Sequence, residues 1–359
     1  MGKTPGCGPP GCGLFGSDPH GELTNQNVLV AFDEIETTAK KFNLTVEQTE
    51  SALKKSLQLL FDRRKTRPRP HLDDKILTAW NGLMISGFAK AASALGEEKY
   101  AERAEKAATF VKNHLTDGDG SLLRSVYRDK SDPALVAQLS SPISAFADDY
   151  AFLIAGLLDL YGCTFNCEWL RWAEQLQNKM DDLFWDQDCD SGYFLSTNKD
   201  SSVLIRMKED HDGAEPSANS VASLNLVRLS RLFDNNNYLL KAKRIFTGFE
   251  QRLTKVPFVV PTMVVALSLC HSAATELVLA GPRNEALKSL INSVNQVYLP
   301  EKVLIVLDGE KDGWLKEKVK RLELLVPVDG KATAFVCQNF SCSLPVHTSE
   351  QLDQLLISC

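Results

Sequence analysis

Apolar residues along the chain follow two helical patterns that take turns. One pattern is a single apolar stripe opposite a polar face, typical of a helix that touches solvent on one side. The other covers most of the helix circumference, typical of a helix packed on several sides. The striped segments are residues 46–61, 100–115, 169–184 and 238–253, and the segments apolar on most sides are residues 76–88, 151–161, 216–233 and 258–269.

This order of outer and inner helices predicts a mainly α fold, an (α/α) toroid in which an outer ring covers an inner one. A solenoid of helix pairs is the alternative, but the sequence shows no fixed-period repeat. Links from inner to outer helices are short, whereas three of the four links from outer to inner helices are long. We therefore expect the long loops to gather where the inner helices begin.

The pattern changes near residue 274 to short β-type runs separated by helical stretches. Strands are expected at residues 277–279, 303–307 and 333–337, with helices at 285–297 and 349–357. The predicted organisation is a disordered tail over residues 1–17, the toroid part over 18–273, and a small α/β domain over 274–359.

Composition limits the function classes. The net charge of −6 argues against nucleic acid or an anionic membrane as partner. The basic run at residues 63–69 is explained by a solvated linker, with anion binding as the alternative. Nine cysteines scattered over 359 residues indicate a reduced, intracellular chain. Without a signal peptide or a long apolar run in the sequence, we expect a soluble, cytoplasmic protein.

Polar clusters precede three inner helices, at His71, Asp73 and Asp74, then at Asp148 to Tyr150, then at residues 210–215. The topology should bring the three clusters to one mouth. Carboxylates that share a partly buried mouth separate one another's pKa values, so that one can act as an acid while another stays ionised. The bland alternative is that each Asp is an ordinary helix cap.

Other candidate features favour structural roles. Trp80 is more simply interpreted as a core residue than as a platform for a sugar ring. His71 and His211 are more simply interpreted as surface groups than as an acid/base pair. Cys337 and Cys342 do not have the spacing of a thioredoxin-type motif, so packed free thiols are the simpler interpretation. Nothing in the sequence indicates a metal or a cofactor.

Several motifs resemble the spermatogenesis-associated protein 20 family, over residues from about Asp18 to the C-terminus. They are residues 69–75, 80–83, 149–151 and 212–220, and the segment that contains Cys337 and Cys342. The resemblance implies a six-hairpin toroid similar to those of sugar epimerases and glycosidases, and a link to sperm development. It also implies a thioredoxin-like domain and opening hairpins that have no counterpart here, so we expect the C-terminal part only and an incomplete ring.

Two functions follow as hypotheses. The first is a glycosidase- or epimerase-like site for a sugar-like small molecule. Its acid/base candidates are Asp73, Asp149, Asp212 and Glu215, and its lining candidates are His71, Trp80, Asn81, Tyr150 and Asn219. The second is a non-catalytic binding or scaffold module, or an inactive truncated isoform. An incomplete ring also leaves apolar helix faces uncovered, which predicts self-association.

Overall fold

The structure, a computed structural model, describes residues 15–17, 29–31, 33–70, 72–129, 136–137, 141–200, 202–309, 312–338 and 341–357. The chain divides into two compact units, Met1–Asp73 and Asp74–Cys359, and each is described by itself. Of the predicted disordered tail, residues 1–14 lie outside the described residues and Phe15–Ser17 form a strand. The predicted domain boundaries, after residues 17 and 273, stay predictions.

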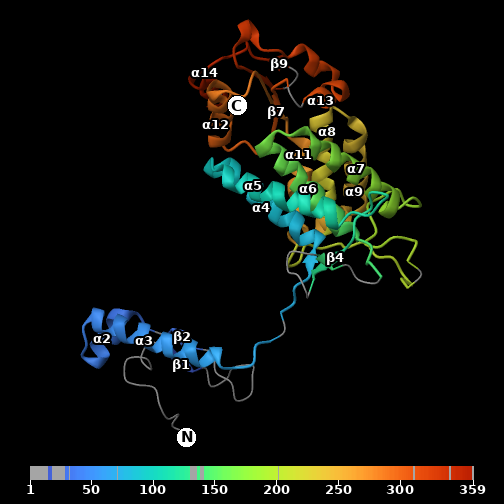
Figure 1. Cartoon of the computed structure of the whole chain (residues 1–359). Helices are drawn as coiled ribbons and strands as arrows, with labels where there is room; N and C mark the ends of the chain where they lie inside the picture. The colour runs from blue at the N-terminus through green and yellow to red at the C-terminus, as the bar shows by residue number, and fades with distance from the viewer. Residues whose placement is uncertain are drawn as a thin grey trace. The chain divides into compact units, whose positions relative to one another are not determined.

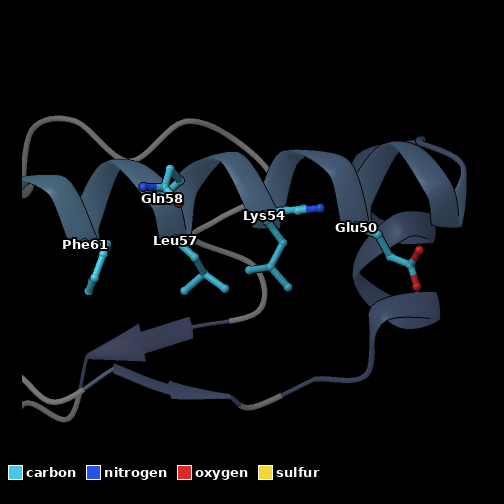
Figure 2. A pocket seen from close by; sticks show the side chains of 6 residues that line it. Glu50, Lys54, Leu57, Gln58 and Phe61 are labelled. Carbon is cyan, nitrogen blue, oxygen red and sulfur yellow. The ribbon is translucent and has the colours of Figure 1, made fainter.

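Among its described residues, the first unit has two helices and a two-stranded antiparallel sheet of β1 (Phe15–Ser17) and β2 (Leu29–Ala31). Helix α2 (Ile35–Phe42), which the sequence analysis did not predict, packs against α3 (Val46–Lys65). Thr45 begins α3 with a reciprocal cap, because its hydroxyl accepts from the Gln48 amide and its own amide donates to the Gln48 side chain. Figure 2 shows a shallow pocket of about 510 Å³ along α3, where Leu57 and Phe61 contribute apolar surface.

The second unit is an arc of helix hairpins (Figure 1). Inner helices pack side by side in chain order, and three outer helices each pack against the inner helix that precedes them. This is an incomplete α/α toroid, as predicted. The inner helices are α4 (Thr78–Leu95), α6 (Ala147–Thr164), α8 (Ala218–Phe233) and α11 (Pro261–His271), and the outer ones are α5 (Glu98–His114), α7 (Cys167–Phe184) and α9 (Asn236–Gly248), which α10 (Glu250–Lys255) follows. Among the described residues, no helix is long and apolar enough to cross a bilayer.

Each of the first three inner helices ends in the same way. Gly96, Phe165 and Asp234 take left-handed backbone conformations, with φ of 67°, 54° and 51°, directly after α4, α6 and α8. A left-handed residue at this position ends a helix and reverses the chain. The short links from inner to outer helices follow from this repeated turn.

An ion cluster centred on Asp159 joins three inner helices. Asp159 of α6 accepts hydrogen bonds from Ser86 of α4 and Arg228 of α8, and the Lys90 ammonium lies 3.3 Å from it. Burial raises the pKa of Asp159, but Arg228 and Lys90 outweigh burial and lower it. The carboxylate therefore stays charged and ties α4, α6 and α8 together.

The C-terminal segment forms a four-stranded sheet in the order β7-β6-β8-β9, with β6 and β7 parallel. It lies at the C-terminal ends of the inner helices. Arg231, in the last turn of α8, donates to the Glu301 carbonyl just before β7 at 3.4 Å, and Arg283, after β6, donates to the Thr164 carbonyl at the end of α6 at 3.3 Å. The predicted strands and helices are present, and α13 was not predicted. Their bounds are β6 (Thr275–Ala280), α12 (Glu285–Gln296), β7 (Lys302–Leu307), α13 (Gly313–Lys318), β8 (Thr333–Gln338), β9 (Ser341–Cys342) and α14 (Ser349–Ile357).

Cys337 and Cys342 are joined by a disulfide, so the expectation of packed free thiols is wrong for this pair. The reason is register, since β8 and β9 pair antiparallel and place these two cysteines directly opposite each other. Four other cysteines of the described segments, Cys163, Cys167, Cys189 and Cys270, are free thiols.

Helices α4 and α6 cross with their backbones in contact at Gly82 of α4 and Gly156 of α6. A Cβ at Gly82 would lie 2.6 Å from the Leu153 amide nitrogen, whereas one at Gly87, on the same helix, would meet nothing within 4 Å. We predict that Gly82→Ala lowers the free energy of unfolding by about 2 kcal/mol or more, because the two helix backbones must separate. Gly87→Ala should instead raise it by up to about 1 kcal/mol through helix propensity. Urea unfolding measures both, and equal effects would contradict the crossing.

Candidate functional site

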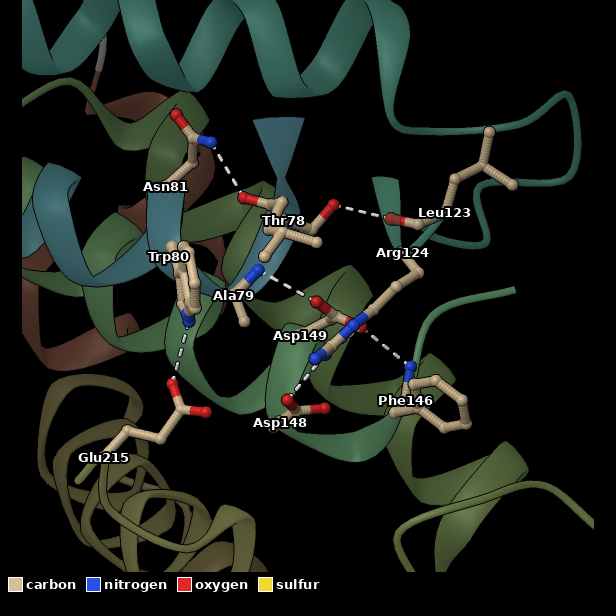
Figure 3. Close-up of polar contacts among 11 residues, drawn as sticks. Thr78, Ala79, Trp80, Asn81, Leu123, Arg124, Phe146, Asp148, Asp149 and Glu215 are labelled. Carbon is tan, nitrogen blue, oxygen red and sulfur yellow. Dashed lines mark hydrogen bonds and ion pairs between the residues drawn. The ribbon is translucent and has the colours of Figure 1, made fainter. Parts of the chain in front are cut away.

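Asp149 clamps the N-termini of two inner helices (Figure 3). Its buried carboxylate accepts from the Ala79 amide in the first turn of α4 at 2.9 Å. It also accepts from the Phe146 amide at the start of α6 at 2.9 Å and from the Arg124 guanidinium at 3.0 Å. The helix N-termini supply unpaired amides and favour negative charge, so one carboxylate stabilises both helix starts. These contacts favour a supporting role for Asp149 over the predicted catalytic one.

A small antiparallel sheet places Arg124 beside that clamp. Strand β4 (Ser125–Arg128) pairs with β3 (Ile76–Leu77) on one side and β5 (Val136–Ala137) on the other. The Thr78 amide donates to the Arg124 carbonyl at 3.0 Å, and the Thr78 hydroxyl donates to the Leu123 carbonyl at 2.6 Å. Arg124 was not predicted, although it lies in one of the long links expected between an outer and an inner helix.

Asp148 and Asp149 share this single guanidinium. Arg124 lies 2.6 Å from one oxygen of Asp148, and the other oxygen, Oδ1, is buried and accepts no hydrogen bond from the described part of the chain. Burial, followed by repulsion from Asp148, raises the pKa of Asp149 to about 7. Asp148 was mentioned in the sequence analysis as part of a cluster but not as a site residue.

Trp80 and Glu215 meet at the same mouth. The indole Nε1 of Trp80 donates to Glu215 at 3.1 Å, which links α4 to the loop before α8. Trp80 is 57% exposed, so the expectation that it belongs to the core is wrong. An exposed ring with its polar end tied to a carboxylate offers a flat apolar face to a ligand.

A third carboxylate, Glu209, completes the group and was missed. Burial, followed by the charge of Asp148, raises the pKa of Glu209, and Glu215 adds to the effect. The Ala218 amide at the start of α8 opposes it by hydrogen bonding. The predicted cluster began at Asp210, one residue later, because the acids there stood out and a glutamate before them did not. We call Trp80, Asp148, Glu209 and Glu215 the acidic mouth.

The remaining predicted residues brace the loops around this mouth. Asp212 accepts from the Ser217 and Thr262 amides at 2.9 Å each, and so supports the starts of α8 and α11. The buried Tyr150 hydroxyl accepts from the Leu122 amide at 2.8 Å. Asn219 pairs with both backbone groups of Tyr193, and Asn81 donates to the Leu77 carbonyl. These contacts favour structural roles for all four.

Two predicted residues are not placed in the mouth. His71 lies outside the described residues. Asp73 is the last residue of the first unit, so its proximity to the other carboxylates stays a prediction. Across the described segments, no group of three or more His, Cys, Asp or Glu residues is arranged to hold a metal ion.

The raised pKa of Asp149 predicts a pH dependence of stability. A carboxyl whose pKa rises on folding stabilises the fold fully below its ordinary pKa and loses that contribution as pH rises through the folded value. We therefore expect the free energy of unfolding to fall by on the order of 2 kcal/mol between about pH 4 and pH 7. Asp148→Asn should shrink this fall by removing the repulsion, whereas Asp182→Asn, on an exposed position of α7, should leave it unchanged. Urea unfolding across this pH range gives the answer, and identical pH profiles for both variants would contradict the assignment.

No protein-family model matches the chain, but curated relatives do. Spermatogenesis-associated protein 20 of Homo sapiens is 41% identical over 342 residues, which cover 94% of this chain and 43% of that protein. The Mus musculus protein of the same name is 40% identical over the same shares. An uncharacterized protein of Caenorhabditis elegans is 39% identical over 340 residues, 94% of this chain and 45% of that protein. The chain thus spans less than half the length of these relatives.

Solved structures resemble the chain only distantly. An α-mannanase of glycoside hydrolase family 76 from Bacteroides thetaiotaomicron has a TM-score of 0.44 and 13% identity, over 64% of this chain and 58% of that one. Cellobiose 2-epimerase from Bacillus thermoamylovorans has a TM-score of 0.41 and 14% identity, over 77% and 68%. The fold described above therefore rests on the contacts between this chain's own helices. By sequence, over 94% of its length, the chain is a homologue of the proteins named spermatogenesis-associated protein 20.

Proposed function

We propose that the acidic mouth binds a polyhydroxylated, carbohydrate-type small molecule. The observation that carries the proposal is Oδ1 of Asp148, a buried carboxylate oxygen without a donor in the described part of the chain. Leaving a buried polar atom unpaired costs about 1–3 kcal/mol, and proteins retain such atoms mainly where a ligand, ion or water completes them. A sugar hydroxyl is a donor of the required kind.

Trp80 and Glu215 complete the recognition elements. The exposed indole face suits the C–H face of a sugar ring, and the carboxylate beside it can accept a neighbouring hydroxyl. Trp80 lies on α4 and Glu215 lies in the loop before α8, so a ligand in contact with both side chains would bridge these two elements.

Catalysis at this mouth would depend on Glu209 and not on the predicted Asp149 or Asp212. Glu209 has a raised pKa, which suits a proton donor, while Arg124 holds Asp148 as an ion pair. A glycosidase- or epimerase-like reaction is therefore proposed with Glu209 as acid. The competing function is non-catalytic binding, which the engagement of Asp149 and Asp212 by backbone amides favours.

The relatives' name links them to spermatogenesis. We extend the proposal to a role of this chain in sperm development. This role is a proposal because the chain spans only 43% of the human relative.

Glu215→Gln tests the binding site. We expect at least a tenfold weaker affinity for cellobiose or mannobiose, because a hydrogen bond from a hydroxyl to an amide oxygen is weaker than one to a carboxylate. The melting temperature should stay nearly unchanged. Glu105→Gln is a matched control. Glu105 also accepts a hydrogen bond from an indole, that of Trp169 at 3.3 Å, but it does not belong to the acidic mouth.

Isothermal titration calorimetry on the full chain measures these affinities. Binding that survives Glu215→Gln and Asp148→Asn unchanged would overturn the site. An equally large loss of stability in Glu215→Gln, but not in Glu105→Gln, would identify Glu215 as structural.

Self-association is proposed through the uncovered face of α4. Trp80, Met84 and Leu95 are each more than half exposed on this helix. Contiguous exposed apolar surface is uncommon on monomers and commonly marks association. We expect light scattering to give a mass above the 39.7 kDa of one chain, and the Met84→Lys variant to give a mass closer to that of one chain. A monodisperse monomer at high concentration would contradict this expectation.

A further inference from the structure

The disulfide between Cys337 and Cys342 lies at an accessible edge of the C-terminal sheet. It links β8 to β9, a two-residue edge strand whose side chains are both exposed. Cys342 itself is exposed, so a thiolate in solution can approach its sulfur.

The hairpin does not depend on this bond for its pairing. The Ser343 amide donates to the Val336 carbonyl at 2.9 Å, and Ala334 and Val346 exchange two backbone hydrogen bonds at 2.8 and 3.1 Å. On its other side β8 pairs with the central strand β6 along its whole length. The disulfide also closes a loop with a sequence separation of only 5, and short loops gain least from a cross-link.

The charges beside Cys337 are balanced. Glu276 of β6 stands opposite Cys337 in the register and shares its face of the sheet. The Arg321 guanidinium bonds to Glu276, so a thiolate formed at Cys337 does not face an unpaired carboxylate.

We propose that Cys337 and Cys342 form a reversible redox couple that exchanges electrons with a dithiol reductant while the fold stays intact. One thiolate of the reductant attacks Sγ of Cys342, a mixed disulfide forms, and Cys337 leaves as a thiolate that takes up a proton. The second thiol of the reductant then displaces Cys342. The dithiol is oxidised to its disulfide, and the protein disulfide gains two electrons and two protons.

The test treats the oxidised full chain with dithiothreitol, quenches with acid and counts thiols by maleimide labelling and mass. We expect two additional thiols per molecule, and a reduction rate in native buffer within about tenfold of that in denaturant, as for an exposed disulfide. The far-ultraviolet circular dichroism should not change, and oxidised dithiothreitol in excess should restore the bond.

The variant Cys337→Ser/Cys342→Ser is the control, because it should gain no thiols and so assigns the signal to this pair. Reduction more than about a hundredfold slower in native buffer than in denaturant would show that the bond opens only on unfolding, and would overturn the proposal. Loss of helical signal on reduction would overturn it as well, as a structural cross-link. Both outcomes can be measured on the unsubstituted chain, whether or not the variant folds.

Discussion

The hydrogen bond from the Ala79 amide to Asp149 fixes where two inner helices begin relative to each other. The two residues lie 70 positions apart, and this bond connects the first turns of α4 and α6 directly. Because the carboxylate is buried, it needs further donors, and Phe146 and Arg124 supply them. The close glycine crossing of α4 and α6 lies one turn further on, so the clamp and the crossing together define the mouth.

That clamp divides the carboxylates into two groups. The carboxylate oxygens of Asp149 and Asp212 accept hydrogen bonds from backbone amides, so little accepting capacity remains for a ligand. Asp148 keeps one oxygen without a donor among the described residues. Burial and then the charge of Asp148 raise the pKa of Glu209, and the charge of Glu215 adds to the rise. The mouth is thus built from acids adjacent to those that hold it in place.

The helices could be predicted because each face repeats every three to four residues, and each of the eight expected segments contains a helix, although Ile76 and Leu77 form a strand. Helix α2 was missed because its eight residues offer too short a period. The roles of Asp149 and Arg124 could not be predicted, since they depend on contacts between residues far apart in the sequence. The exposure of Trp80 was missed for a related reason, because its surroundings depend on which neighbours α4 has. The disulfide depended on a strand register that spacing alone does not specify.

The central claim is that the mouth beside the Asp149 clamp is a ligand site completed by Oδ1 of Asp148. A crystal structure of the full chain soaked with cellobiose tests it most directly. The account predicts a sugar ring against the Trp80 indole, with one hydroxyl within about 3 Å of Asp148 Oδ1. Density for the disaccharide elsewhere, or a protein group that donates to Asp148 Oδ1 in an empty mouth, would contradict it.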